Sequence, residues 1–192
     1  MIKSIIFDFA GVIGSDGYWV LLKERLLNFE DKKIFFHDLS IKVDDGTINN
    51  KEFVEIIASE LKMPEDIVWK EIFKKVIINQ ELLTLISQLK KNYKICLLTN
   101  YTHEWMSELI DIYKLDKYFD VKVISSLEKL AKPDKKIYLI ALSRLNLKPN
   151  EAIFIDDRQY NVDGGEEVGI KSLLFVSNEQ LIKDLKNLEI KV

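Results

Sequence analysis

The chain has 192 residues, of which 47% are apolar and 31% charged, and its formal net charge is −3. This length suits one α/β domain, or such a domain with a small insertion, and the composition is typical of globular proteins. The absence of a clustered basic segment argues against nucleic acid as the main partner, and no apolar run is long enough to span a membrane. No cationic and then apolar leader precedes the first apolar run, so we expect a cytoplasmic protein, either a monomer or a weak homo-oligomer.

Five short apolar runs are expected to form strands that are buried on both faces, because their apolar character is continuous and does not alternate. In chain order they are residues 2–7, 93–98, 121–124, 152–155 and 171–176. The single cysteine, Cys96, lies inside the second run, which excludes an internal disulfide and predicts a residue that fills the core. Helical periodicity between the runs, such as Trp105, Leu109 and Ile112, predicts a doubly wound α/β fold. Its sheet would be five-stranded, mostly parallel and Rossmann-like.

The interval between the first two expected strands is far longer than one crossover helix needs. Within it, apolar residues recur with helical spacing around residues 19–26 and 53–61, and no segment is typical of a strand. We therefore predict a helical cap domain, residues 15–80, inserted after the first strand. Residues 1–14 and 81–192 would form the core domain, with a crossover helix at 81–91.

Polar side chains follow the expected strands at the edge where an open α/β sheet binds its ligands. In chain order these are Asp8, Thr99, Asn100, Lys132, Asp156 and Asp157. Clustered carboxylates repel one another unless a cation joins them, and such hard oxygen ligands select Mg²⁺. A carboxylate beside the metal can attack phosphorus, while Lys132 and the Thr99 hydroxyl hold phosphoryl oxygens. Each residue alone could be a helix cap or a surface charge, and only their joint occurrence at successive strand ends indicates a site.

In these residues the chain resembles the haloacid dehalogenase superfamily. The similar segments are residues 5–13 around Asp8, residues 97–100 ending in Thr99-Asn100, Lys132-Pro133-Asp134, and residues 154–157 ending in the acidic pair. These four motifs occur in the family's order and cover essentially the whole chain. The predicted helical insertion falls between the first and second motifs, where the family has its cap.

The resemblance implies an Mg²⁺-dependent phosphatase that hydrolyses a small phosphorylated metabolite, such as a sugar phosphate, through an aspartyl-phosphate. It implies that Asp8 is the nucleophile and a metal ligand, together with the backbone carbonyl of Ala10, Asp157 and Asp156. Thr99, Asn100 and Lys132 would bind the phosphoryl group. Asn161 would either support the metal site or be an exposed helix residue.

The chain departs from the family's pattern at Ala10, where most of its phosphatases have an acid/base aspartate. Three interpretations stay open at this point. The protein could be a phosphatase of a subgroup with a small residue here and a short cap, similar to sugar-phosphate phosphatases. It could cleave a C–P bond as phosphonoacetaldehyde hydrolases do, with Lys23 or Lys51 as the cap lysine. It could also be a catalytically weak phosphate-binding or partner-binding module. A 2-haloacid dehalogenase is the least favoured activity, because such enzymes need no metal and usually lack the acidic pair.

The insertion is expected to close over Asp8 and to set specificity. Its polar and aromatic candidates for contact with the substrate are Asp16, Tyr18, Trp19, Arg25, His37 and Asp38. Of these, Trp19 lies on an apolar stripe and is expected in the core, whereas Arg25 is expected at the surface.

Overall fold

The five expected strands form one parallel sheet in the computed structural model, which describes residues 1–191. The strands are β1 (Ser4–Phe7), β2 (Lys94–Thr99), β3 (Val121–Ile124), β4 (Ala152–Asp156) and β5 (Lys171–Leu174). Their order in the sheet is β3-β2-β1-β4-β5, and every neighbouring pair is parallel. The predicted α/β fold is confirmed, and the carboxyl ends of all five strands meet at one edge.

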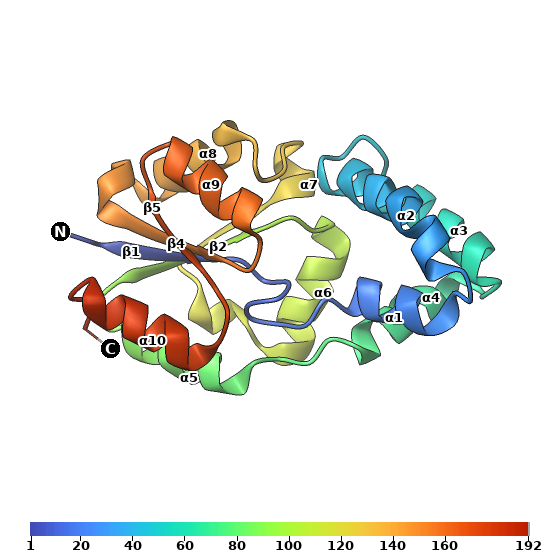
Figure 1. Ribbon diagram of the computed structural model, residues 1–192, viewed down its shortest axis with the longest axis horizontal. Helices are drawn as coiled ribbons and strands as arrows, with labels where there is room; N and C mark the ends of the chain where they lie inside the picture. The colour runs from blue at the N-terminus through green and yellow to red at the C-terminus, as the bar shows by residue number, and fades with distance from the viewer. Residues whose placement is uncertain (192) are drawn as a thin grey trace.

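Helices cover both faces of the sheet (Figure 1). On one face lie α5 (Gln80–Leu89), α6 (His103–Tyr113) and α10 (Asn178–Asn187), and on the other lie α8 (Lys135–Leu145) and α9 (Gln159–Glu167). Successive residues of β1 point to opposite faces, so that Ile5 and Phe7 join one core cluster while Ile6 joins the other. Cys96 is buried with Ile6 and burial raises the pKa of its thiol, so the cysteine fills the core as predicted.

Short elements complete the connections at both ends of the sheet. A turn of 3₁₀ helix, η1 (Asp116–Tyr118), leads into β3, and a second, η2 (Pro149–Glu151), leads into β4. The one-turn helix α7 (Ser125–Glu128) follows β3 directly. Gly169 follows α9 with a φ of +87°, a backbone conformation that often ends a helix.

The segment between β1 and α5 is helical, as predicted. It contains α1 (Gly17–Arg25), α2 (Phe29–Asp44), α3 (Asn50–Leu61) and α4 (Glu65–Lys74), which extend beyond the carboxyl edge of the sheet at the right of Figure 1. The two chain segments that join these helices to the core are hydrogen-bonded to each other. Ser15 N–H donates to Ile77 O (3.0 Å), and Asn79 N–H donates to Ile13 O (2.9 Å). The division into a core of 1–14 and 81–192 and a cap of 15–80 stays a prediction.

The apolar pattern of the sequence does not identify the buried face of α2, and it places one residue of α6 wrongly. In α2, Phe36, Leu39 and Val43 are buried while Ile34 and Ile41 are exposed, so apolar residues surround the helix and hide its buried face. In α6, the buried face runs through Trp105, Met106, Leu109 and Ile110, which leaves Ile112 exposed, contrary to the expected stripe. No helix among residues 1–191 combines the length and apolar character needed to cross a bilayer.

Candidate active site

Asp8 opens a tight loop at the carboxyl end of β1. Its N–H donates to Ile155 O (2.9 Å), which ties the loop to the neighbouring strand β4. Gly11 lies in this loop with a φ of +81°, and a Cβ at this position would overlap the carboxylate of Asp157. Glycine is therefore required here for two reasons, the left-handed backbone and the close approach to Asp157.

Lys132 is a buried cation between two carboxylates. Its side chain is 1% exposed, and Nζ lies 2.8 Å from Asp8 Oδ1 and 2.6 Å from Asp156 Oδ2. The side chain of Asn100 holds the main chain of Lys132 from both sides, because Oδ1 accepts from Lys132 N–H (2.8 Å) and Nδ2 donates to Lys132 O (2.9 Å). Residues that follow β1, β2 and β4 thus converge on this lysine.

The buried charges shift the pKa values of Asp8 and Lys132. Burial and the charge of Asp156 raise the pKa of Asp8 to about 7, although the charge of Lys132 opposes the shift. Burial also tends to lower the pKa of Lys132, but the carboxylates of Asp156 and Asp8 outweigh this and hold it above its ordinary value. One lysine therefore neutralises this acidic cluster incompletely, and the site favours an additional cation.

The two members of the acidic pair have different surroundings. The oxygens of Asp156 accept from Lys132 Nζ, from Arg158 N–H (2.9 Å) and from Asn161 Nδ2 (3.0 and 3.1 Å). Among residues 1–191, the side chain of Asp157 is paired with the exposed Arg158 side chain alone, with 3.2 Å between Oδ2 and Nε. Carboxylate oxygens of Asp8, Asp156 and Asp157 lie within 4.8 Å of one another, an arrangement that can hold a metal ion. Asn161 is buried, so the exposed-helix alternative for this residue is wrong.

Thr99 ends β2 with its side chain completely buried. Among the described residues its hydroxyl has no hydrogen-bond partner, and neither has Oδ1 of Asn161. A buried polar group without a partner costs about 1–3 kcal/mol, so native proteins rarely leave one unless a ligand or water satisfies it. The Thr99 hydroxyl is thus available to a bound group beside Asp8 and Lys132.

The candidate residues of the helical segment mostly have other partners. Tyr18 is buried and its hydroxyl donates to Phe36 O (3.0 Å), while Asp16 caps α1 by accepting from Trp19 N–H (3.3 Å). Arg25 lies 3.7 Å from a carboxylate oxygen of Glu71. The side chain of Trp19 is partly buried against the core, as expected, and His37 and Asp38 are exposed neighbours on α2 whose side chains lie 3.8 Å apart.

Sequence reasoning missed Asp44, the last residue of α2. Burial raises its pKa well above the ordinary range, as do the charges of Asp16 and Asp8, while Lys132 lowers it, so this carboxyl lies near the strand-end cluster. Its sequence context, an acidic residue before Asp45-Gly46, is typical of a helix end followed by a turn, and periodicity gives it no further signal.

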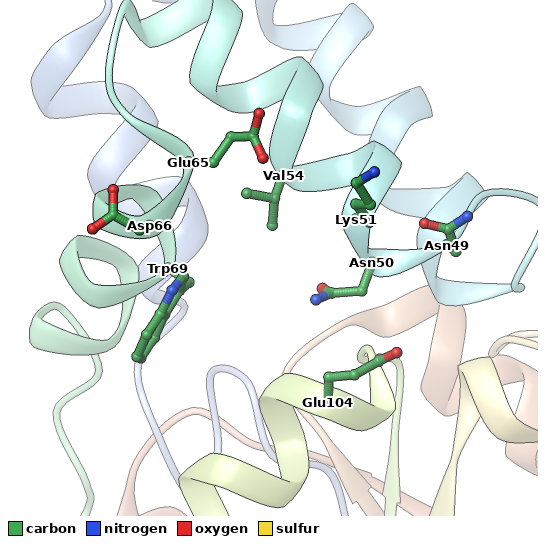
Figure 2. Close-up of a pocket in the computed structure, with 8 residues that line it drawn as sticks. All are labelled: Asn49, Asn50, Lys51, Val54, Glu65, Asp66, Trp69 and Glu104. Atoms are coloured by element: carbon green, nitrogen blue, oxygen red, sulfur yellow. The ribbon is translucent and has the colours of Figure 1, made fainter.

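A pocket with a volume of about 630 Å³ lies elsewhere, between α3, α4 and the first turn of α6 (Figure 2). Its lining residues are Asn49, Asn50, Lys51, Val54, Glu65, Asp66, Trp69 and Glu104. Three of these are carboxylates and one is a lysine, so the pocket is not built for a phosphate group. The polar groups that could bind a phosphoryl group lie at the strand ends, not in this pocket.

A family model described as haloacid dehalogenase-like hydrolase matches residues 2–169. The chain belongs to this family. Among its haloacid dehalogenase-like relatives is a phosphorylated carbohydrates phosphatase from Thermotoga maritima, which is 25% identical over 89% of this chain and 83% of that protein. A flavin mononucleotide hydrolase from Arabidopsis thaliana is 35% identical over 59% of the chain and 45% of its own length. The chain spans less than half the length of the first curated relatives it matches.

Solved structures of the haloacid dehalogenase family share the fold. A family enzyme from Bacteroides thetaiotaomicron, crystallised with magnesium and inorganic phosphate, aligns with a TM-score of 0.78 at 22% identity, covering 93% of this chain and 96% of that chain. That neighbour was crystallised with both ligands, and the acidic cluster of this chain could itself hold a metal ion.

The contact between Gly11 and Asp157 predicts a specific cost for a Cβ at residue 11. We expect Gly11→Ala to lower the free energy of unfolding by about 1–3 kcal/mol, because it combines a left-handed backbone with a clash. Gly46→Ala is a matched control, since Gly46 has a φ of +74° but its Cβ would meet Ser126 O at an ordinary 3.4 Å. Urea unfolding of both variants measures the difference, and equal losses would contradict the clash with Asp157.

The raised pKa of Asp8 predicts how the stability of the metal-free protein depends on pH. Between the ordinary value of 3.8 and about 7 the folded protein holds a proton that the unfolded chain loses, so this group's contribution to stability falls as pH rises through that window. We expect Asp8→Asn to raise Tm at pH 8 in EDTA, by about 2–4 °C for each 1 kcal/mol gained, and to have a much smaller effect at pH 4.

Thermal melts at both pH values measure this effect, with the exposed Asp163→Asn as the control for loss of one negative charge. An Asp8→Asn variant less stable than wild type at pH 8 would show that the Asp8–Lys132 ion pair outweighs the burial and repulsion of the carboxylate.

Proposed function

We propose that the protein is an Mg²⁺-dependent phosphatase that hydrolyses a small phosphorylated metabolite through an aspartyl-phosphate on Asp8. The single observation that carries this proposal is the convergence of a buried carboxylate, a buried ammonium and an unpartnered buried hydroxyl at one sheet edge, from Asp8, Lys132 and Thr99. An anion with several oxygens satisfies the hydroxyl and the ammonium while it faces the carboxylate. Relatives named as a phosphorylated carbohydrates phosphatase and a flavin mononucleotide hydrolase support the same class of reaction.

Each residue has a role that follows from its contacts. Asp8 attacks phosphorus with the oxygen that faces the phosphoryl group, and Lys132 and the Thr99 hydroxyl bind the non-bridging oxygens as negative charge builds on them. Asn100 positions Lys132 through its two hydrogen bonds to the lysine main chain. Because Lys132 is buried and held by Asp156, its ammonium keeps one orientation during the reaction.

Mg²⁺ fits the donor set, which consists of hard carboxylate oxygens that one lysine neutralises incompletely. We propose that Asp8, Asp157 and the backbone carbonyl of Ala10 hold the ion. Asp156 lies within the same cluster, but its oxygens already accept four hydrogen bonds, so its role is to hold Lys132 and Asn161. When bound, the ion supplies charge neutralisation between the attacking carboxylate and the phosphoryl oxygens.

The geometry favours this function over cleavage of a C–P bond. A Schiff-base lysine needs a depressed pKa, usually from burial in an apolar pocket. Lys51 is exposed and lies 3.4 Å from Glu55, and Lys23 is exposed on α1. Neither lysine has the required surroundings.

The proposal predicts Mg²⁺-dependent release of inorganic phosphate from small phosphomonoesters. We expect Asp8→Asn to abolish turnover, a loss of at least about 10³-fold, because an amide cannot form the covalent intermediate. A panel of sugar phosphates and nucleoside monophosphates, assayed with and without EDTA, measures it, with the exposed Asp163→Asn as the control.

A folded, Mg²⁺-loaded protein that releases no phosphate from the panel would contradict the phosphatase and favour a binding module. Acetaldehyde formed from phosphonoacetaldehyde, with borohydride trapping on a lysine, would favour the C–P hydrolase instead.

A further inference from the structure

Ala10 leaves the proposed phosphatase without an obvious proton donor. An alkoxide leaving group needs a proton as its bond to phosphorus breaks, and general acid catalysis is typically worth about 10²–10⁴-fold. A methyl side chain cannot supply it. The following inference rests on the proposed function and concerns the group that takes over this role.

The C-terminal end of α2 is docked on the sheet edge that carries the site. Beyond Asp44 the chain turns through Gly46, where a Cβ would lie 3.4 Å from Ser126 O of α7. In Figure 1 the end of α2 lies beside α7. The Oγ of Ser125, the first residue of α7, in turn bonds both the N–H and the carbonyl of Tyr101 (3.0 and 3.3 Å). Contacts therefore connect the end of α2 to the residue that follows Asn100.

The same tyrosine lies against the loop that carries the nucleophile. The ring of Tyr101 packs edge-to-face on Phe9, with 5.9 Å between centroids, and Phe9 separates Asp8 from Ala10 in the chain. Burial raises the pKa of the Tyr101 phenol, and the nearby charges of Asp16 and Asp44 raise it further. The end of α2 contacts α7, and the charge of Asp44 acts on both Tyr101 and Asp8, so Asp44 lies on the side of the site that Tyr101 borders, although it is more than thirty residues from Asp8 in the chain.

Asp44 differs from the other carboxyl groups near the loop of Asp8, because its side chain has no partner among residues 1–191. Asp16 caps α1 through Trp19 N–H, and Asp157 faces Arg158. The side chain of Asp44 makes no hydrogen bond and no ion pair within residues 1–191, and it is half-buried, so a ligand can reach it.

The charges around Asp44 favour its protonated form. Burial has the largest effect on its pKa and raises it, and Asp16, Asp8 and Asp45 raise it as well, against a single opposing charge from Lys132. The phenols of Tyr18 and Tyr101 are the other titratable groups that share this environment. A carboxyl that keeps its proton near neutral pH is suited to donate it.

We propose that Asp44, carried by the cap helix α2, is the general acid and base that replaces the missing carboxylate at residue 10. In the first step an oxygen of Asp8 bonds to phosphorus, the ester P–O bond breaks, and the leaving oxygen takes the electron pair and the Asp44 proton. In the second step the Asp44 carboxylate accepts a proton from water as the water oxygen bonds to phosphorus. The P–O bond to Asp8 then breaks, and Asp8 regains its electron pair.

The test measures kcat of each variant on two phosphate esters that differ in their leaving group. p-Nitrophenyl phosphate has an activated leaving group that needs no proton, whereas the alkyl phosphomonoester most active in the panel needs one. We expect Asp44→Asn to lower kcat on the alkyl ester by about 10²-fold or more and on p-nitrophenyl phosphate by less than about 10-fold. Asp45→Asn is the matched control, because it removes the same charge one residue away and an amide oxygen can still accept from Thr47 N–H (2.9 Å).

The outcomes separate this inference from the proposed function. Equal losses on both esters, or no loss on the alkyl ester, would overturn the role of Asp44 while a working wild type upholds the phosphatase. A wild type inactive on both esters, although folded and Mg²⁺-loaded, would overturn both. Asp44→Ser serves the same comparison if the asparagine variant is unstable.

Discussion

The placement of one ammonium between two carboxylates organises the site. Lys132 is buried between Asp8 and Asp156, and a buried charge is tolerated only when it is paired and hydrogen-bonded. The sheet order makes the pairing possible, since β1 lies between β2 and β4 and brings their carboxyl ends side by side. The excess negative charge around this lysine is what makes a divalent cation favourable. The same charges leave the ligand-free site less stable than a neutral one, so function here opposes stability.

The acidic pair illustrates how neighbouring identical residues take different roles. Asp156 ends a buried strand and its oxygens are saturated by Lys132, Arg158 N–H and Asn161. Asp157, one residue later, points the other way toward Gly11 and solvent, with only a salt bridge to the exposed Arg158. Because Asp156 is the last residue of β4 and Asp157 lies in the bend that follows, the pair places one carboxylate at the lysine and one at the loop of Asp8. The glycine of the first motif and the second aspartate of the last motif thus depend on each other sterically.

Features that depend on strand ends were accessible from the sequence, and features that depend on side-chain packing were not. Continuous apolar runs identify strands of a parallel sheet, and the carboxyl ends of these strands must share one edge. The sequence alone therefore predicts that Asp8, Thr99 and Asp156 lie close together. The hold of the Asn100 side chain on the Lys132 main chain has no sequence signature, because it depends on rotamers and on a loop between distant elements. Asp44 was missed for a similar reason, since its place follows from the long-range contact between α2 and the single turn of α7, and the apolar residues of α2 are spread around the helix.

A proton donor on the cap differs physically from one on the loop of the nucleophile. A carboxyl at residue 10 would always be next to Asp8, whereas the proposed role of Asp44 depends on the contact between the end of α2 and α7. With the donor on the cap, proton transfer is coupled to closure, because the state that excludes solvent is also the state that supplies the acid. When α2 moves away, the aspartyl-phosphate meets bulk water but no positioned base, so opening by itself does not speed its hydrolysis. In this proposal the acid/base group lies on the cap helix α2 and not on the loop of the nucleophile, where residue 10 is an alanine.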